Sequence, residues 1–237
     1  MDIFHFKKFK IIQNSASVFK VNTEAVLLSA WVNLSNVNSI LEIGCGTGVI
    51  SLGLVQRLST NVKITAIDIN IDAVELTKKN INVNQIQNVN AIHNSIQEFS
   101  IKYDSKFDLI ISNPPYFDTP LKSTKKRDLL AKYTDTLNYE TLIAISKSLL
   151  ATNGRIALVL PYSDLDSIQK IALKNNLFLT RKWKVHTSHK KQALRILIEL
   201  STNSKNILET EDLYIKNEVG DFTEKYKEIT REYYTIF

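Results

Sequence analysis

The chain has 237 residues, a net charge of +6 and one cysteine, a length that suits one domain with a sizeable core. The single cysteine excludes an internal disulfide and suits a reducing cytoplasm. The absence of about 18 consecutive apolar residues, and an N-terminus that alternates Phe with Lys, predict no membrane span and no signal peptide.

Apolar periodicity predicts strands and helices that alternate along most of the chain. Either Asn22 or Thr23 can cap the first helix, and Asn153-Gly154 is a helix stop. In chain order, the expected elements are a hairpin at 4–12, helix 23–31, strand 39–43, helix 48–58, strand 62–67, helix 71–83, strand 89–92, strand 107–112, helix 138–150, strand 155–160, helix 163–175, an antiparallel pair at 178–185 and 193–200, a strand from 214 and helix 223–233.

This alternation predicts an α/β fold built on a parallel sheet with right-handed crossovers. We expect one domain over residues 1–237. In it, residues 1–32 form an N-terminal strand and helix, residues 33–201 form the core, and residues 202–237 form a C-terminal strand and helix that pack on the core.

A glycine-rich loop follows the first core strand. Glu42 lies near the end of this strand, and the loop Gly44-Cys45-Gly46-Thr47-Gly48 leads into a helical pattern. Glycines allow close approach of the backbone to a ligand, and the start of a helix offers N–H groups. Asp68 ends the second core strand, 24 residues beyond Gly44, at a spacing typical of a carboxylate that receives ribose hydroxyls.

The loop does not match the dinucleotide fingerprint, because Val49 stands where the third glycine is required. Glu42 also precedes the loop, where a carboxylate suits a cationic ligand better than a pyrophosphate. S-adenosylmethionine carries a sulfonium and an ammonium, so the pattern favours that cofactor. The cofactor-binding residues that we predict here are Glu42, Gly44, Gly46, Gly48, Asp68 and Ile69.

The segment from Phe107 to Tyr116 reads as a buried strand that ends at a stiff turn. Pro114 and Pro115 stop strand pairing, and the first of them fixes an extended backbone at Asn113. The Asn113 side-chain oxygen and the Pro114 carbonyl can accept hydrogen bonds from a planar amino group and stabilise the charge that develops when it is alkylated. Tyr116 can stack on the ring that carries the amine. We predict Asn113, Pro114, Pro115 and Tyr116 to be the catalytic residues.

These motifs, in this order, resemble the class I S-adenosylmethionine-dependent amino-methyltransferases. The resemblance is closest to the bacterial enzymes that methylate N6 of the adenine 3′ to the anticodon in valine tRNA, and it runs nearly end to end. The residues that carry it are the loop after Glu42 and the segments 4–9, 20–31, 107–116, 131–134 and 222–237.

The resemblance implies a Rossmann-like, seven-stranded, mostly parallel sheet whose last strand pair is antiparallel. It also implies that Thr23 lies beside the methionine part of the cofactor, although a plain helix cap explains Thr23 equally well. Ser95 stands where related enzymes often carry an aspartate that contacts the cofactor adenine. We keep Ser95 and Asn113 among the cofactor-binding residues.

Basic residues cluster just after Tyr116 and recur near both ends of the chain. They could clamp phosphates around a base that has left its stack, although a solvated loop is the alternative. The predicted RNA-binding residues are Lys7, Lys8, Lys122, Lys125, Lys126 and Arg127, and Lys10, Lys190 and Lys191 extend the surface. His186 and His189 have no acidic or cysteine neighbours in the pattern, so we expect no metal site.

The hypothesis that follows is N6-methylation of adenine in the anticodon loop of valine tRNA by a cytoplasmic, monomeric, single-domain enzyme. Methylation of a glutamine side-chain amide on a protein, or of guanine N2 in rRNA, uses the same Asn-Pro-Pro-Tyr chemistry. A non-catalytic RNA-binding protein with this fold is a third reading. A pyrimidine-C5 mechanism is disfavoured, because Cys45 is the lone cysteine and lies in the glycine loop.

Overall fold

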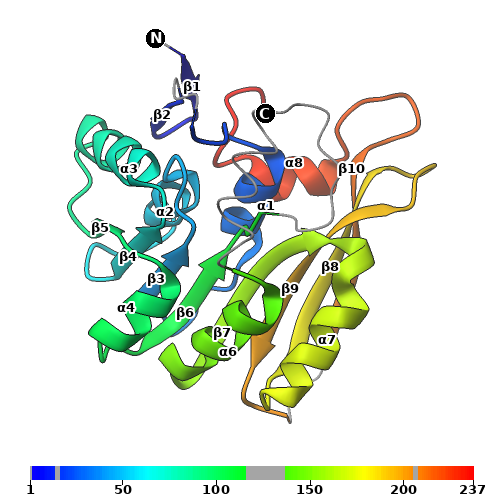
Figure 1. Cartoon of the computed structure of the whole chain (residues 1–237). Coiled ribbons are helices and arrows are strands. Elements are labelled where there is room, and N and C mark those ends of the chain that lie inside the picture. Colours follow the sequence, from blue (N-terminus) through cyan, green and yellow to red (C-terminus); the bar gives the residue numbers. More distant parts are fainter. Residues whose placement is uncertain (1, 14–16, 116–136, 205–207) are drawn as a thin grey trace.

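The structure is a computed structural model and describes residues 2–13, 17–115, 137–204 and 208–237. In this part of the chain, eight strands form one sheet in the order β10-β8-β9-β7-β6-β3-β4-β5, covered by helices on both faces (Figure 1). The strands are β3 (Ser39–Ile43), β4 (Lys63–Asp68), β5 (Val89–His93), β6 (Phe107–Ser112), β7 (Leu150–Pro161), β8 (Phe178–Ser188), β9 (Ala193–Ser201) and β10 (Glu209–Lys216). The helices are α1 (Thr23–Trp31), α2 (Val49–Val55), α3 (Ile71–Val83), α4 (Ile96–Lys102), α6 (Tyr139–Leu149), α7 (Leu165–Lys174) and α8 (Glu224–Thr230), with a 3₁₀ turn η1 (Tyr162–Asp164).

The direction of the strands confirms the predicted class of fold. Strands β5, β4, β3, β6 and β7 run parallel, and β9 is antiparallel to both β7 and β8. The seven expected core strands are present. The strand expected from 214 begins earlier, at Glu209, and as β10 it adds an eighth strand by pairing in parallel with β8. None of the helices described here is both long and apolar enough to cross a membrane.

The central strands are apolar on both faces because each face is covered by helices. Ile40 and Leu109 face the core beneath α1, α2, α3 and α8, whereas the neighbouring Leu41 and Ile110 face the core beneath α4, α6 and α7. All four side chains are fully buried. The register pairs Ile43 with both Ile67 and Ser112, so β3, β4 and β6 end at nearly the same level and the loops after them meet.

The two ends of the chain pack on each other. A hairpin of β1 (Ile3–His5) and β2 (Lys10–Ile12) forms where the sequence predicts one. The rings of Phe6 and Phe9 stack at 4.4 Å, and Tyr233 meets both edge-on at 6.5 Å. Helix α8 lies against α1 (Figure 1), so the C-terminal segment reaches the side of the sheet where the glycine loop begins its helix.

Two local expectations differ from the structure. The short helix α4 was not predicted, since its seven residues carry little periodicity, although Ser95 caps it. Helix α6 ends at Leu149, before the expected Asn153-Gly154 stop, and those two residues instead form an irregularity within β7. A Cβ on Gly154 would lie 2.8 Å from the Phe107 carbonyl oxygen, so glycine is required there by the close approach of β6.

Candidate active site

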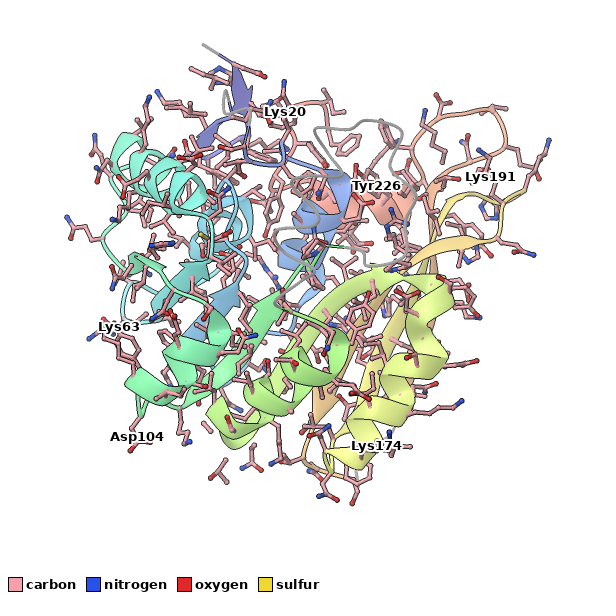
Figure 2. All side chains as sticks on the ribbon, in the orientation of Figure 1. Lys20, Lys63, Asp104, Lys174, Lys191 and Tyr226 are labelled. Atoms are coloured by element: carbon pink, nitrogen blue, oxygen red, sulfur yellow. The ribbon has the colours of Figure 1, made fainter. Side chains whose placement is uncertain are left out.

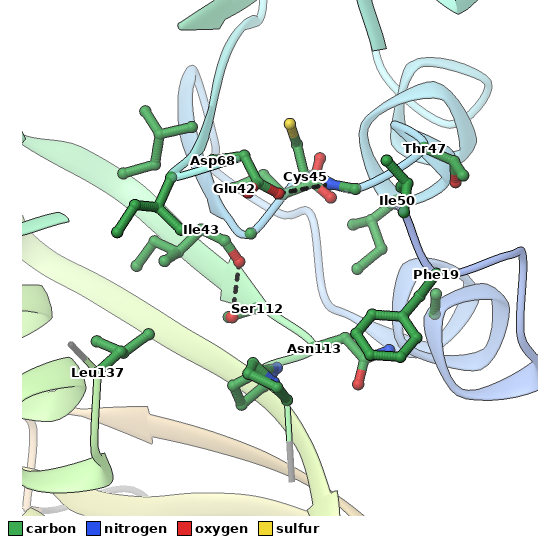
Figure 3. A pocket seen from close by; sticks show the side chains of 18 of the residues that line it. Phe19, Glu42, Ile43, Cys45, Thr47, Ile50, Asp68, Ser112, Asn113 and Leu137 are labelled. Carbon is green, nitrogen blue, oxygen red and sulfur yellow. Dashed lines mark hydrogen bonds between the residues drawn. The ribbon is translucent and has the colours of Figure 1, made fainter. Parts of the chain in front are cut away.

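A pocket of about 330 Å³ lies at the carboxyl ends of β3, β4, β5 and β6 (Figure 3). This is the edge at which open α/β sheets bind ligands. The pocket brings together nine of the predicted site residues, namely Glu42, Gly44, Gly46, Asp68, Ile69, Ser95, Asn113, Pro114 and Pro115. Thr23 and Gly48 do not line it.

The glycine loop adopts a backbone that only glycine tolerates well. Gly44 and Gly46 have φ of +77° and +56°, and a Cβ on either would meet no atom within 4 Å. The two residues therefore border open space in the pocket, as a loop that receives a ligand should. Gly48 differs, because it caps α2 and a Cβ there would lie 3.0 Å from Thr77 Cγ2, so its role in the structure is close packing against α3.

The loop is pinned by a neighbouring strand and helix. Gly44 and Cys45 both donate their N–H groups to the Ile67 carbonyl, at 2.8 and 3.0 Å. On the other side, the fully buried Asn80 of α3 donates to the Thr47 carbonyl at 2.9 Å and exchanges hydrogen bonds with the backbone of Ile12. The same asparagine therefore ties the N-terminal hairpin to the loop.

Asp68 has a structural role beside the binding role that its spacing predicts. One carboxylate oxygen accepts the Gly46 N–H at 3.0 Å (dashed in Figure 3), and the other accepts the Asn70 N–H at 2.9 Å. The side chain is almost entirely buried and lines the pocket. Asp68 thus holds the loop in shape at the place where a ligand would reach it.

Glu42 is a buried carboxyl group whose two oxygens differ. Oε2 accepts hydrogen bonds from the backbone N–H and the hydroxyl of Ser51 in α2. Oε1 has no partner among the described residues. Burial, and to a smaller extent the charge of Asp68, raises the pKa of Glu42 to about 8, against the lowering effect of the Ser51 hydrogen bonds. The ionised form of this carboxyl group is disfavoured by burial, so a cationic ligand in the pocket would stabilise that form.

Asn113 follows β6 directly and faces the pocket across from Glu42 and Asp68 (Figure 3). Its position is fixed by Ser112, whose hydroxyl donates to the Ile43 carbonyl at 2.7 Å. Its amide nitrogen donates to Asn22 Oδ1 at 3.4 Å, and the same oxygen caps α1 by accepting the Ala25 N–H at 2.8 Å. Because Asn22 presents an acceptor, the Asn113 nitrogen faces it, and the side-chain oxygen lies on the other side of the amide.

Other predicted residues lie elsewhere. Tyr116, Lys122, Lys125, Lys126 and Arg127 are outside the described residues. Lys7 donates to the Phe237 backbone oxygen at 2.7 Å, and Lys8 pairs with Glu232 at 2.8 Å, so both engage the C-terminal segment. The Thr23 side chain lies beside Tyr234, and Thr23 does not line the pocket.

The structure adds pocket residues that the sequence patterns do not reveal. The hydroxyl of Ser95 is used as a helix cap and accepts the Glu98 N–H at 3.1 Å. Its neighbour Asn94 lines the pocket with a buried side-chain oxygen that has no partner among the described residues. Glu24 and Arg195 also line it and form an ion pair at 3.1 Å. No local motif marks Asn94 or Arg195, since each reaches the pocket only through the sheet.

Comparisons with known proteins agree with the fold. The family profile described as "Methyltransferase small domain" matches residues 13–175. Among solved structures, a predicted O-methyltransferase from Agrobacterium tumefaciens is similar with a TM-score of 0.67 at 15% identity, over 88% of this chain and 95% of that one. A methyltransferase from Pyrococcus furiosus has a TM-score of 0.59 at 19% identity, over 81% and 88%. Fold and pocket together define a class I methyltransferase.

The sequence relatives narrow this class. A curated protein of a Flavobacteriaceae bacterium is 36% identical over 99% of both chains, and one of Parabacteroides distasonis is 36% identical over 98% of this chain and 97% of its own. A third, from Pseudoalteromonas translucida, is 34% identical over 99% of both. All three are named tRNA1(Val) (adenine(37)-N6)-methyltransferase, and the chain belongs to this family.

Proposed function

We propose that the protein transfers a methyl group from S-adenosylmethionine to N6 of the adenine at position 37 in a valine tRNA. The names of the relatives supply the substrate. The observation that carries the chemistry is the Asn113 amide, which stands at the end of β6 with its nitrogen held by Asn22 and lines the same pocket as the glycine loop.

The pocket fits the cofactor in two respects. Open space beside Gly44 and Gly46 lets the cofactor approach the backbone of the loop closely. The Glu42 oxygen that has no partner among the described residues can face the positive charge of the cofactor. In this proposal Glu42 faces the cationic end, Asp68 the ribose, and Asn94 rather than Ser95 the adenine amine. When bound, the cofactor supplies an electrophilic methyl group on sulfur.

The chain's own residues then position and activate the amine. The Asn113 side-chain oxygen and the Pro114 carbonyl accept from the two N–H groups of N6, which favours the pyramidal, nucleophilic form of the nitrogen. The proton on nitrogen becomes far more acidic once the N–C bond forms, so no strong general base is needed. Orientation and these acceptors are the main contributions to the rate. Stacking by Tyr116 and phosphate contacts from the basic residues 122–127 belong to the proposal.

The decisive experiment compares Asn113→Ala with the unchanged protein. We expect turnover to fall by a factor of about 100 or more, as on loss of an oxyanion-hole donor, with little change in cofactor affinity measured by calorimetry. Products are identified by mass analysis of nucleosides from unmodified valine tRNA, in parallel with a release-factor protein as an amide substrate. Near-normal turnover of Asn113→Ala refutes the assigned role, and methylation of the protein alone refutes the substrate.

A further inference from the structure

The hairpin between β8 and β9 carries an ordered group of rings and cations that the methyl-transfer site does not use. The hairpin-tip surface consists of His186, His189, Lys190, Lys191 and, on the neighbouring strand β10, Tyr214. His189, Lys190 and Lys191 are exposed to solvent. The Tyr214 ring stacks on His186 at 4.5 Å and on His189 at 3.9 Å, with interplanar angles of 25° and 15°.

The rings are held in place before any partner arrives. One ring nitrogen of His186 lies 2.7 Å from Asp212 Oδ1 and the other lies 2.9 Å from the Lys191 carbonyl oxygen. The Lys191 N–H in turn bonds to the Ser188 carbonyl at 3.1 Å, which closes the turn. These contacts hold the rings in one arrangement, so the rings would lose less conformational entropy on binding a partner.

The hairpin-tip surface stands at the same edge of the sheet as the pocket. Arg195 lines the pocket and pairs with Pro161 at the end of β7, and β9 continues beyond it to Ala193, which is level with His186. Strand β8 is three places from β6 in the sheet, so His186 is displaced from Asn113 across the strands by roughly 14 Å, at about 4.8 Å per strand, and it also lies farther out along the strand direction. Figure 2 shows Lys191 at this edge, and Lys63 and Lys174 at the opposite one.

The geometry points to the hairpin-tip surface as a contact for single-stranded RNA that flanks the target adenine, with His189 stacking on a base and Lys190 and Lys191 binding phosphates. Single-stranded loops are recognised by this combination of aromatic or imidazole faces and cations. The inference rests on the proposed function for the identity of the RNA, and it assigns the β8–β9 hairpin as the part of the chain that holds the loop.

The cations are tested with a double variant, Lys190→Ala with Lys191→Ala, against a charge-matched control, Lys63→Ala with Lys174→Ala. Binding of unmodified valine tRNA is measured by fluorescence anisotropy across a salt series. We expect the hairpin variant alone to bind more weakly and to lose roughly 0.7 from the salt slope per lysine. KM for tRNA should rise while kcat and the cofactor dissociation constant stay unchanged. Equal behaviour of the two double variants overturns the assignment.

The ring is tested separately. His189→Ala should weaken tRNA binding by about five-fold or more, with no change in salt slope, and His189→Phe should restore it because a flat ring returns. If His189→Ala binds as tightly as the unchanged protein, the stacking role is wrong.

Failure here is distinguishable from failure of the proposed function. The binding measurements are repeated with the hairpin variants combined with Asn113→Ala, because tRNA binding can be measured without methylation. Hairpin-dependent tRNA binding without methylation of any tRNA refutes the proposed function and leaves the hairpin-tip surface standing. If valine tRNA is methylated equally well by all the hairpin variants, the role of the hairpin-tip surface is refuted and the proposed function stands.

Discussion

Replacing Glu42 by Gln should raise the folding stability of the cofactor-free protein and lower its affinity for the cofactor. Glutamine has the same shape, and its side-chain oxygen can still accept from the Ser51 N–H and hydroxyl that now bind Oε2. What the substitution removes is a carboxyl group whose pKa is raised from 4.5 to about 8 by burial. The effect on stability must therefore depend on pH.

The sign follows from proton linkage. The folded state holds the Glu42 proton more tightly than the unfolded state, so the unchanged protein loses stability as pH rises from 4.5 through about 8. At a pH above both values the loss approaches about 5 kcal/mol, and it grows by about 3 kcal/mol between pH 5.5 and pH 8. Glu42→Gln does not titrate and escapes this loss.

Urea unfolding of both proteins across this pH range measures the effect. The advantage of Glu42→Gln should widen toward pH 8 by an amount of this order. Calorimetry near pH 7 tests the expected effect on cofactor binding, because a cationic ligand would favour loss of the proton from Glu42. Binding of S-adenosylmethionine should release protons from the unchanged protein, seen as a dependence on buffer ionisation enthalpy, and should be weaker and free of this release in Glu42→Gln. A stability difference that does not change with pH would refute the reasoning.

Four further substitutions separate binding from packing. Asn94→Ala should weaken cofactor binding about ten-fold with little loss of folding stability, since the buried side-chain oxygen has no partner to lose among the described residues. Ser95→Ala should lose about 1 kcal/mol of folding stability, because it removes a helix cap, and should keep its affinity for the cofactor. Calorimetry measures the affinities and urea unfolding the stabilities, and the opposite pattern would favour Ser95 as the contact. Gly44→Ala should abolish cofactor binding, because its positive φ strains any residue with a Cβ and because the Cβ would occupy open space at the pocket that the cofactor needs. Normal affinity in a folded Gly44→Ala protein would contradict this. Asn80→Leu should destabilise the chain by about 2–4 kcal/mol, because it removes three buried hydrogen bonds, and a loss below about 1 kcal/mol in urea unfolding would show that the tie is unimportant.

Much of the site could be predicted from sequence because its key residues follow strands. Glu42, Asp68 and Asn113 each stand at or just after the end of a continuous apolar run, and parallel strands end at a common edge. Glycines at alternate loop positions and a proline pair after Asn113 mark the two loops without any knowledge of the fold. In the structure these three residues line one pocket.

Tertiary structure decided what local patterns do not encode. Asn22 is read from sequence as a helix cap, and only the fold shows that the same oxygen orients the Asn113 amide. Gly48 looks equivalent to Gly44 and Gly46 until α3 is packed against it. Lys7 and Lys8 read as free cations until the C-terminal segment folds back to meet them.

The sequence by itself therefore determined the order of strands and helices apart from α4, the class of sheet, and the two loops at its ligand-binding edge. It could do so because burial periodicity and turn chemistry act over a few neighbouring residues. The tertiary structure alone decided which side chains from distant elements share a hydrogen bond, as Asn80 does with Ile12 and Thr47, and which cations remain available to a partner. Those outcomes depend on residues far apart in the chain, whose proximity exists only after the sheet has formed.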